Sequence, residues 1–124
     1  SLNNEDSSFI GNHQPKSEDT IRISSFNPNG LPVQQLQEQL HYSTDEGIDI
    51  QCFTEINQNM INHLHRKKYQ DTVRKVDRKA KDVWVNTDIP MESVYKPGGA
   101  SIISFNSVSA IFISILFEFW FSFF

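Results

Sequence analysis

The sequence predicts an α/β fold in which helices pack against a layered sheet. Three short apolar segments rich in β-forming residues alternate with two segments that have the periodicity of amphipathic helices, in the order strand, helix, strand, helix, strand. The chain has 124 residues, of which 38% are hydrophobic and 21% are charged. This length suits one small domain, and the composition is typical of a globular protein rather than a disordered one.

Composition divides the chain into three parts. Residues 1–20 are polar, lack the apolar stretch of a signal peptide and are expected to form a flexible leader. Residues 21–105 contain the predicted strands and helices, and residues 106–124 are apolar. The single cysteine, Cys52, excludes an internal disulfide and is expected to be a buried structural thiol. It suits a reducing compartment, which favours an intracellular location, nuclear or cytoplasmic.

The first strand and the first helix are predicted within residues 20–47. Residues 20–26, TIRISSF, alternate apolar and polar side chains and end at the turn sequence NPNG, as a half-buried strand does. Pro32 follows this turn and is a favourable first residue of a helix. Apolar residues then repeat at i, i+3 and i+7, and Gly47 is expected to end the helix. The repeating residues are Val33, Leu36 and Leu40.

The second half of the predicted domain begins with residues 48–54, IDIQCFT, a continuous β-forming run expected to be buried on both faces. Residues 66–83 predict the second helix, because apolar residues recur there in steps of four and three. These residues are Tyr69, Val73, Val76, Ala80 and Val83. Residues 86–99 contain two prolines and a double glycine and predict a loop, and residues 100–105, ASIISF, predict the third strand.

Basic residues are concentrated between positions 66 and 82. This segment has eight of the eleven Lys and Arg residues with three Asp, a local charge of +5, although the whole chain has a net charge of −4. A solvated helix face above an apolar stripe is the favoured interpretation, and contact with nucleic acid is the alternative. In the alternative, the contacting side chains are Lys67, Lys68, Arg74, Lys75, Arg78 and Lys79 of this segment and Lys96 of the following loop.

The apolar segment at residues 110–124, AIFISILFEFWFSFF, contains six of the ten Phe residues and one charged residue, Glu118. A soluble domain rarely exposes such a surface. Three interpretations remain open: a membrane-anchoring tail, a buried strand or helix, or a sequence that is not the natural end of the domain. A membrane-spanning helix needs roughly 20 apolar residues, so the first interpretation requires part of 101–109 as well.

Two polar residues follow the first two predicted strands and are candidates for a metal site. Asn29 follows the first strand and Glu55 follows the second. Ligands often lie beyond the carboxyl ends of strands in layered α/β folds. Mg²⁺ prefers oxygen ligands and keeps several waters, so one carboxylate and one amide oxygen would be enough. Gly30 permits a sharp turn beside them. On spacing alone, an ordinary Asn-Pro-Asn-Gly turn explains the pattern equally well.

Three segments, IRISSFNPNGL, DIQCFTEIN and KPGGASIIS, occur in this order and resemble the opening of the endonuclease/exonuclease/phosphatase superfamily. The superfamily includes exonuclease III-like and apurinic/apyrimidinic endonucleases, deoxyribonuclease I and the endonuclease domains of non-LTR retrotransposons. The Lys-rich helix and the loop before Gly98 are most similar to the retrotransposon-type members. The resemblance covers residues 21–105 and implies the amino-terminal part of a DNase I-like layered α/β sandwich.

This resemblance implies the amino-terminal part of a Mg²⁺-dependent phosphodiesterase that acts on nucleic acid. Glu55 would be the principal metal ligand and Asn29 a second one, with the metal acting as a Lewis acid at the phosphate. Asn27 would belong to the polar network around the scissile phosphate and is the candidate catalytic residue. Pro28 departs from the family pattern, which has an ordinary apolar residue there, and it removes a backbone N–H from the strand end.

The later motifs of the family have no counterpart after Phe105. These are a Tyr-x-Pro strand, an Asp-x-Asn segment and a Ser-Asp-His motif that includes the general base. His63 and His65 follow the second strand and are interpreted as surface residues, so they do not replace that base. We therefore expect a truncated endonuclease-like domain from a retrotransposon-derived gene, inactive as given and with weak Mg²⁺ affinity. The alternative is a tail-anchored membrane protein with a soluble α/β head. Neither interpretation implies an obligate protein partner.

Overall fold

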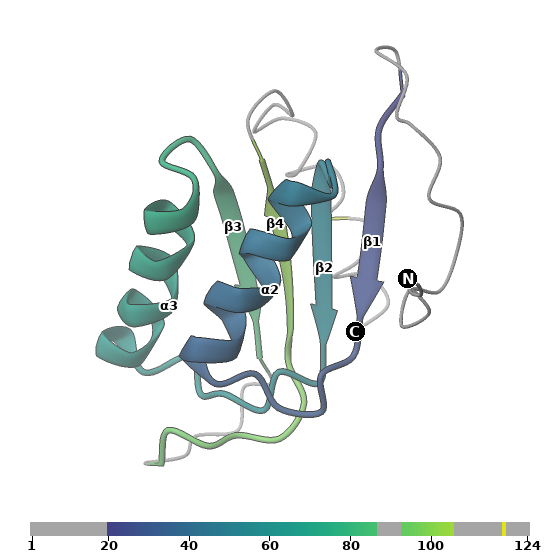
Figure 1. Cartoon of the computed structure of the whole chain (residues 1–124). Coiled ribbons are helices and arrows are strands. Elements are labelled where there is room, and N and C mark those ends of the chain that lie inside the picture. Colours follow the sequence, from purple (N-terminus) through teal and green to yellow (C-terminus); the bar gives the residue numbers. More distant parts are fainter. Residues whose placement is uncertain (1–19, 87–92, 106–117, 119–124) are drawn as a thin grey trace.

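The computed structural model describes residues 20–86, 93–105 and 118. These residues form a mixed four-stranded sheet in the order β1-β2-β4-β3, and both described helices cover the same face of it (Figure 1). The helices are α2 (Val33–Asp45) and α3 (His63–Val76), and the strands are β1 (Ile23–Phe26), β2 (Ile50–Thr54), β3 (Lys81–Val85) and β4 (Ala100–Ser104). The predicted α/β class is confirmed.

The connection from β1 through α2 to β2 brings two strand ends to one edge of the sheet. β1 and β2 are parallel, with Phe26 opposite Phe53 in the register. The carboxyl ends of both strands therefore lie side by side, as Figure 1 shows. β4 runs antiparallel to β2, so the segment that precedes β4 arrives at the same edge.

The second helix differs from its prediction at both ends. α3 begins at His63 and ends at Val76, whereas the sequence predicted a helix over residues 66–83. Asp77 has an extended conformation, and its side-chain Oδ1 accepts a hydrogen bond from the Lys79 N–H, so residues 77–80 form a turn. Ala80 is still buried, but it lies beyond the helix.

Strand β3 was not predicted at all. Residues 81–85 pair antiparallel with β4, although Val83 continues the helical spacing of the apolar residues before it. Val83, Trp84 and Val85 are β-branched or aromatic residues that favour strands. Sheet pairing together with these propensities outweighs the helical periodicity. The predicted order therefore gains one strand.

Smaller corrections concern the element boundaries. β1 begins at Ile23 and β2 at Ile50, later than the predicted strand starts at residues 20 and 48. Pro32 is the residue before α2 rather than its first residue. Leu36 and Leu40 are fully buried as predicted, but Val33 keeps 37% of its surface exposed because it begins the helix at the end of the apolar stripe.

The core lies between the sheet and the two helices. It includes Phe53 of β2 and Ile103 of β4, which pack with residues of the helices, namely Leu36, Leu40, Tyr69 and Val73. Ile50 is three residues from Phe53 and faces the opposite side of the sheet, where it is also fully buried. The prediction that this strand is buried on both faces is therefore confirmed at Ile50, whereas Cys52 and Thr54 on the same face are partly exposed.

Several predicted segments lie outside the described residues. They are the leader up to residue 19, the part of the loop at 87–92, and the apolar segment 110–124 apart from Glu118. Within the ranges that the structure does describe, no helix combines the length and the hydropathy needed to cross a membrane.

Candidate metal site

Two segments meet directly beyond the ends of β1 and β2. The Gly30 N–H donates to the Glu55 carbonyl oxygen at 2.8 Å, and the Leu31 N–H donates to the Ile56 carbonyl oxygen at 2.9 Å. These hydrogen bonds continue the pairing of the two strands past their last residues. They bring the Asn-Pro-Asn-Gly turn next to Glu55.

The glycine-rich segment before β4 contacts the other side of the Glu55 segment. The Asn57 N–H donates to the Gly98 carbonyl oxygen at 2.9 Å, and the Ile56 N–H donates to the Gly99 carbonyl oxygen at 3.4 Å. Residues 55–57 thus lie between the turn after β1 and the segment before β4. The three sequence motifs behind the family resemblance are neighbours in space.

Side chains of the first two segments are joined by a short hydrogen bond. The Asn27 Nδ2 donates to the Glu55 Oε2 at 2.6 Å, and the Asn27 Oδ1 accepts from the Asn29 N–H at 3.0 Å. All three residues are exposed to solvent. Asn29 and Glu55 therefore lie at one sheet edge, and Asn27 connects them.

Backbone strain is concentrated at the same place. Among the described residues, the non-glycine residues with positive φ are Asn29 at 50°, Glu55 at 49° and Asn57 at 55°. Asn adopts this left-handed conformation more readily than most residues, whereas Glu rarely does. Such a conformation costs of order 1–3 kcal/mol and persists where surrounding contacts impose it, often at functional sites. The hydrogen bonds on both sides of Glu55 supply that constraint.

The available donors suit a hard cation that keeps most of its water. Within the described ranges, no group of three or more His, Cys, Asp and Glu side chains surrounds a common point. The Glu55 carboxylate therefore lies beside asparagine residues rather than within a carboxylate cluster. One carboxylate with neutral oxygens fits Mg²⁺, which is often bound by one or two carboxylates. It does not fit a structural zinc site, which needs four nitrogen or sulfur ligands.

The prediction that both histidines are surface residues is wrong for His65. The His65 Nε2 lies 2.8 Å from the Gln58 Oε1, and its ring packs edge-on against Tyr69 with centroids 5.2 Å apart. Burial, and to a smaller extent the charge of Lys68, lowers the pKa of His65. His63 is exposed, as predicted. His65 therefore connects α3 to Gln58, in the segment that follows β2, and the lowered pKa favours its neutral form.

The site is further stabilised from α3 through Tyr69. Its hydroxyl group donates to the Leu31 carbonyl oxygen at 2.7 Å, and its ring packs edge-on against Trp84 with centroids 5.5 Å apart. Burial raises the pKa of Tyr69 to about 12. Tyr69 thus attaches the turn after β1 to α3, and His65 attaches the segment after β2 to the same helix. The sequence shows Tyr69 as an apolar stripe position and gives no sign of the hydrogen bond.

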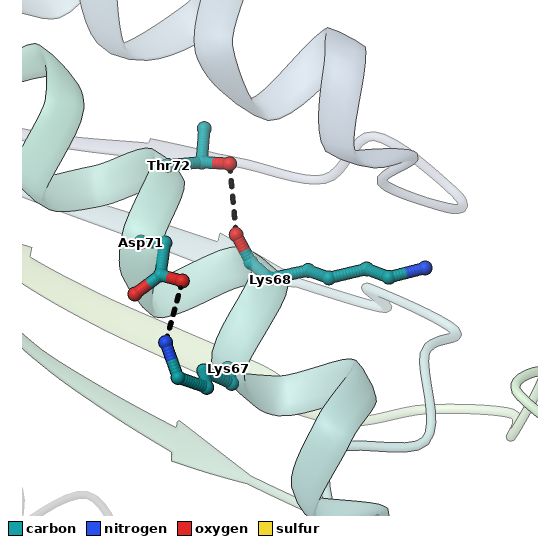
Figure 2. Close-up of polar contacts among 4 residues, drawn as sticks. All are labelled: Lys67, Lys68, Asp71 and Thr72. Atoms are coloured by element: carbon teal, nitrogen blue, oxygen red, sulfur yellow. Dashed lines mark hydrogen bonds and ion pairs between the residues drawn. The ribbon is translucent and has the colours of Figure 1, made fainter.

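The seven basic residues predicted for nucleic-acid contact have different environments. The exposed ones are Lys67, Lys68, Lys75, Arg78 and Lys79. Figure 2 shows the Lys67 ammonium directed at Asp71, 2.9 Å away, while Lys68 extends away from both. Arg74 pairs with the buried carboxylate of Asp82 at 2.7 Å. Lys96 is only 1% exposed, so it does not fit a surface contact.

Cys52 is partly exposed rather than fully buried, and burial raises the pKa of its thiol. A raised pKa disfavours the reactive thiolate, which agrees with a structural role.

Comparison of the chain with protein-family models, with curated proteins and with solved structures finds no match.

Proposed function

We propose that this chain is the amino-terminal part of a Mg²⁺-dependent phosphodiesterase of the endonuclease type, with Glu55 as the principal metal ligand. The observation that supports this most is the 2.6 Å hydrogen bond from Asn27 to the exposed Glu55 carboxylate, across the ends of two parallel strands. It orients one carboxylate oxygen and leaves the other for a cation. Asn29 is the proposed second ligand.

The orientation of the Asn27 amide follows from its own partners. Its Oδ1 accepts from the Asn29 N–H at 3.0 Å, so the Nδ2 end must be the one that faces Glu55. When bound, Mg²⁺ would supply Lewis-acid polarisation of a phosphate oxygen. Asn27 then has two roles in the proposal: it orients Glu55, and its second Nδ2 proton can bind a phosphate oxygen.

The proposed fold is the amino-terminal part of a DNase I-like layered α/β sandwich. Support comes from the sheet face opposite the helices, which contains buried apolar side chains, as a face between two layers does. Ile50, Ala100 and Ile102 alternate with the core-facing residues of β2 and β4 and are at most 3% exposed.

The described site contains no general base. His65 lies near the site segment, but it is engaged with Gln58, and burial lowers its pKa. Phosphodiester hydrolysis also requires an activated water, and the loss of one positioned acid–base group lowers the rate by about 10²–10⁴. We therefore propose that this chain binds the metal and a phosphodiester but does not hydrolyse it. A plasmid-nicking assay in Mg²⁺ that shows Glu55-dependent cleavage would refute this part.

A nucleic-acid backbone is the proposed partner, contacted by the exposed basic residues of α3 and the turn after it. Lys68 is exposed and points away from Asp71, and Lys75, Arg78 and Lys79 are also exposed. Lys67 is available only when its exposed ion pair with Asp71 opens, which costs little at the surface. Arg74 and Lys96 are omitted from the contact set.

Metal binding tests the proposal directly. Mn²⁺ serves as a paramagnetic probe in place of Mg²⁺, with competition by Mg²⁺ to confirm a shared site. Glu55→Gln keeps the shape of the side chain and removes its charge, so Mn²⁺ binding should be lost. Glu38→Gln, at an exposed position on α2, is the matched control and should bind as the wild-type chain does. Equal binding by Glu55→Gln and the wild type would refute the metal site.

A further inference from the structure

We propose that Asn57 is a positioning residue for the metal site, because it fixes the Glu55 segment to the glycine-rich segment before β4. The inference rests on the proposed function only in taking Glu55 as a metal ligand. Asn57 does not face the metal in this proposal. It acts through the backbone that determines where the Glu55 carboxylate lies.

Asn57 pairs with Gly98 through both its backbone and its side chain. The Asn57 N–H donates to the Gly98 carbonyl oxygen at 2.9 Å, and the Gly98 N–H donates back to the Asn57 Oδ1 at 2.9 Å. Both polar groups of one glycine are thus bound by one residue, 41 positions away in the sequence. The Lys96 N–H adds a longer contact to the Asn57 carbonyl oxygen at 3.5 Å.

The other end of the same amide faces the turn after β1. A Cβ atom added at Gly30 would lie 3.9 Å from the Asn57 Nδ2, in ordinary van der Waals contact. Gly30 is also the residue whose N–H donates to the Glu55 carbonyl oxygen. The Asn57 side chain therefore lies between the glycine-rich segment, to which it is hydrogen-bonded, and the turn that contacts Glu55.

The backbone conformation explains why this contact matters for Glu55. Glu55 and Asn57 both have left-handed φ angles, and Ile56 between them is fully buried. The strain at Glu55 persists only while the segment is fixed on both sides. Without the Asn57–Gly98 side-chain bond, Glu55 can relax to an ordinary conformation, which turns its carboxylate away from Asn27.

Two substitutions at position 57 separate the side chain from the backbone. Asn57→Gly accepts positive φ freely and removes the whole amide side chain, including the Oδ1 acceptor. Asn57→Asp keeps an acceptor oxygen for the Gly98 N–H. Asn62→Ala is the control, since Asn62 caps α3 by accepting from the His65 N–H at 3.1 Å and its loss lowers stability without touching the Glu55 segment.

The first readout is the NMR signal of the Asn27 side-chain amide, which reports its hydrogen bond to Glu55 and requires no metal. Glu55→Gln defines the signal of the perturbed bond. We expect Asn57→Gly to shift the signal toward that of Glu55→Gln, and Asn57→Asp and Asn62→Ala to leave it as in the wild type. If Asn57→Gly does not fold, Asn57→Asp decides: a shifted Asn27 signal in that variant would overturn the inference.

The second readout is Mn²⁺ affinity. We expect Asn57→Gly to weaken it about tenfold, which corresponds to the loss of one net hydrogen bond, while Asn62→Ala leaves it unchanged. A lowered Tm in Asn57→Gly with unchanged affinity and an unchanged Asn27 signal would show a merely structural role and overturn the inference. If the wild type does not bind Mn²⁺ at all, the proposed function fails, whereas the Asn27 signal still tests the positioning role.

Discussion

Two adjacent glycines before β4 provide a matched test of the packing at the candidate site. Gly98 and Gly99 both have positive φ, at 81° and 87°. A Cβ atom at Gly98 would meet nothing within 4 Å. A Cβ atom at Gly99 would lie 2.5 Å from the Asn86 Nδ2 and 3.0 Å from both the Ile56 Cγ1 and the Val85 carbonyl oxygen. Substituting Ala at each position therefore separates backbone strain from steric overlap.

The expected magnitudes follow from these two contributions. Gly98→Ala imposes only the unfavourable φ, which costs about 1–3 kcal/mol of unfolding free energy. Gly99→Ala imposes a similar backbone cost together with overpacking, which adds about 1–3 kcal/mol. One of its contacts is backbone, the Val85 carbonyl oxygen, which cannot rotate away. We expect Gly99→Ala to destabilise the domain by about 2–6 kcal/mol in total.

Urea unfolding followed by circular dichroism measures both variants, provided that the denaturant slope m stays constant. The double variant Gly99→Ala with Asn86→Ala removes the closest contact and should recover part of the additional loss, so the two substitutions are not additive. Equal destabilisation by Gly98→Ala and Gly99→Ala would refute the close approach at Gly99. Strict additivity of the double variant would refute Asn86 as the group that is displaced.

Four further outcomes follow from the side-chain contacts. Arg74→Gln should cost about 1–3 kcal/mol of unfolding free energy, because it leaves the buried Asp82 carboxylate with the Trp84 Nε1 as its remaining partner. Lys67→Gln breaks an exposed ion pair and should change stability by less than about 0.5 kcal/mol in the same unfolding assay. Since the pKa of His65 is lowered from 6.5, unfolding free energy should decrease as the pH falls below about 6.5, and His65→Gln should flatten that dependence in pH-dependent melts. Since the pKa of Tyr69 is raised from 10.0 to about 12, stability should be constant below pH 10 and decrease above it, a loss absent from Tyr69→Phe. Any binding of a single-stranded oligonucleotide should weaken steeply as the salt concentration rises, and this salt dependence should decrease when the exposed basic residues of α3 are neutralised. Binding that does not depend on salt would contradict this surface as the contact.

The parts of the fold that the sequence predicts are those in which one periodicity dominates. β2 is a continuous β-forming run, and the buried positions of α2 follow from the spacing of Leu36 and Leu40. β3 was not predicted because Val83 continues the helical spacing of the apolar residues and is also a residue type that favours strands. Only its pairing with β4, a contact between residues about 20 positions apart, decides between the two.

The same distinction applies to the site. Asn29 and Glu55 were predicted because the rule for parallel strand ends and a family resemblance both indicated them, whereas Asn27 was indicated by the resemblance alone. The contact from His65 to Gln58 and the pairing of Asn57 with Gly98 were missed, since neither residue type nor spacing reveals a specific side-chain partner across the fold. The burial of Lys96 was missed for a related reason: a lysine in a polar loop is usually exposed.

The position of the Glu55 carboxylate is a consequence of backbone pairing beyond the strands. Hydrogen bonds to Gly30 on one side and to the glycine-rich segment on the other continue the order β1-β2-β4 past Thr54. In a regular strand, successive side chains would alternate between the two faces of the sheet. The left-handed conformation at Glu55 interrupts this alternation, so that Glu55 is exposed at the edge while Ile56, the next residue, is fully buried. Ile56 lies so close to Gly99 that a larger residue there would overlap with it, and the Asn57 side chain is hydrogen-bonded to Gly98. The carboxylate is therefore positioned by residues other than the proposed metal ligands, and substitutions at Asn57 or Gly99 should displace it more than the loss of Asn29.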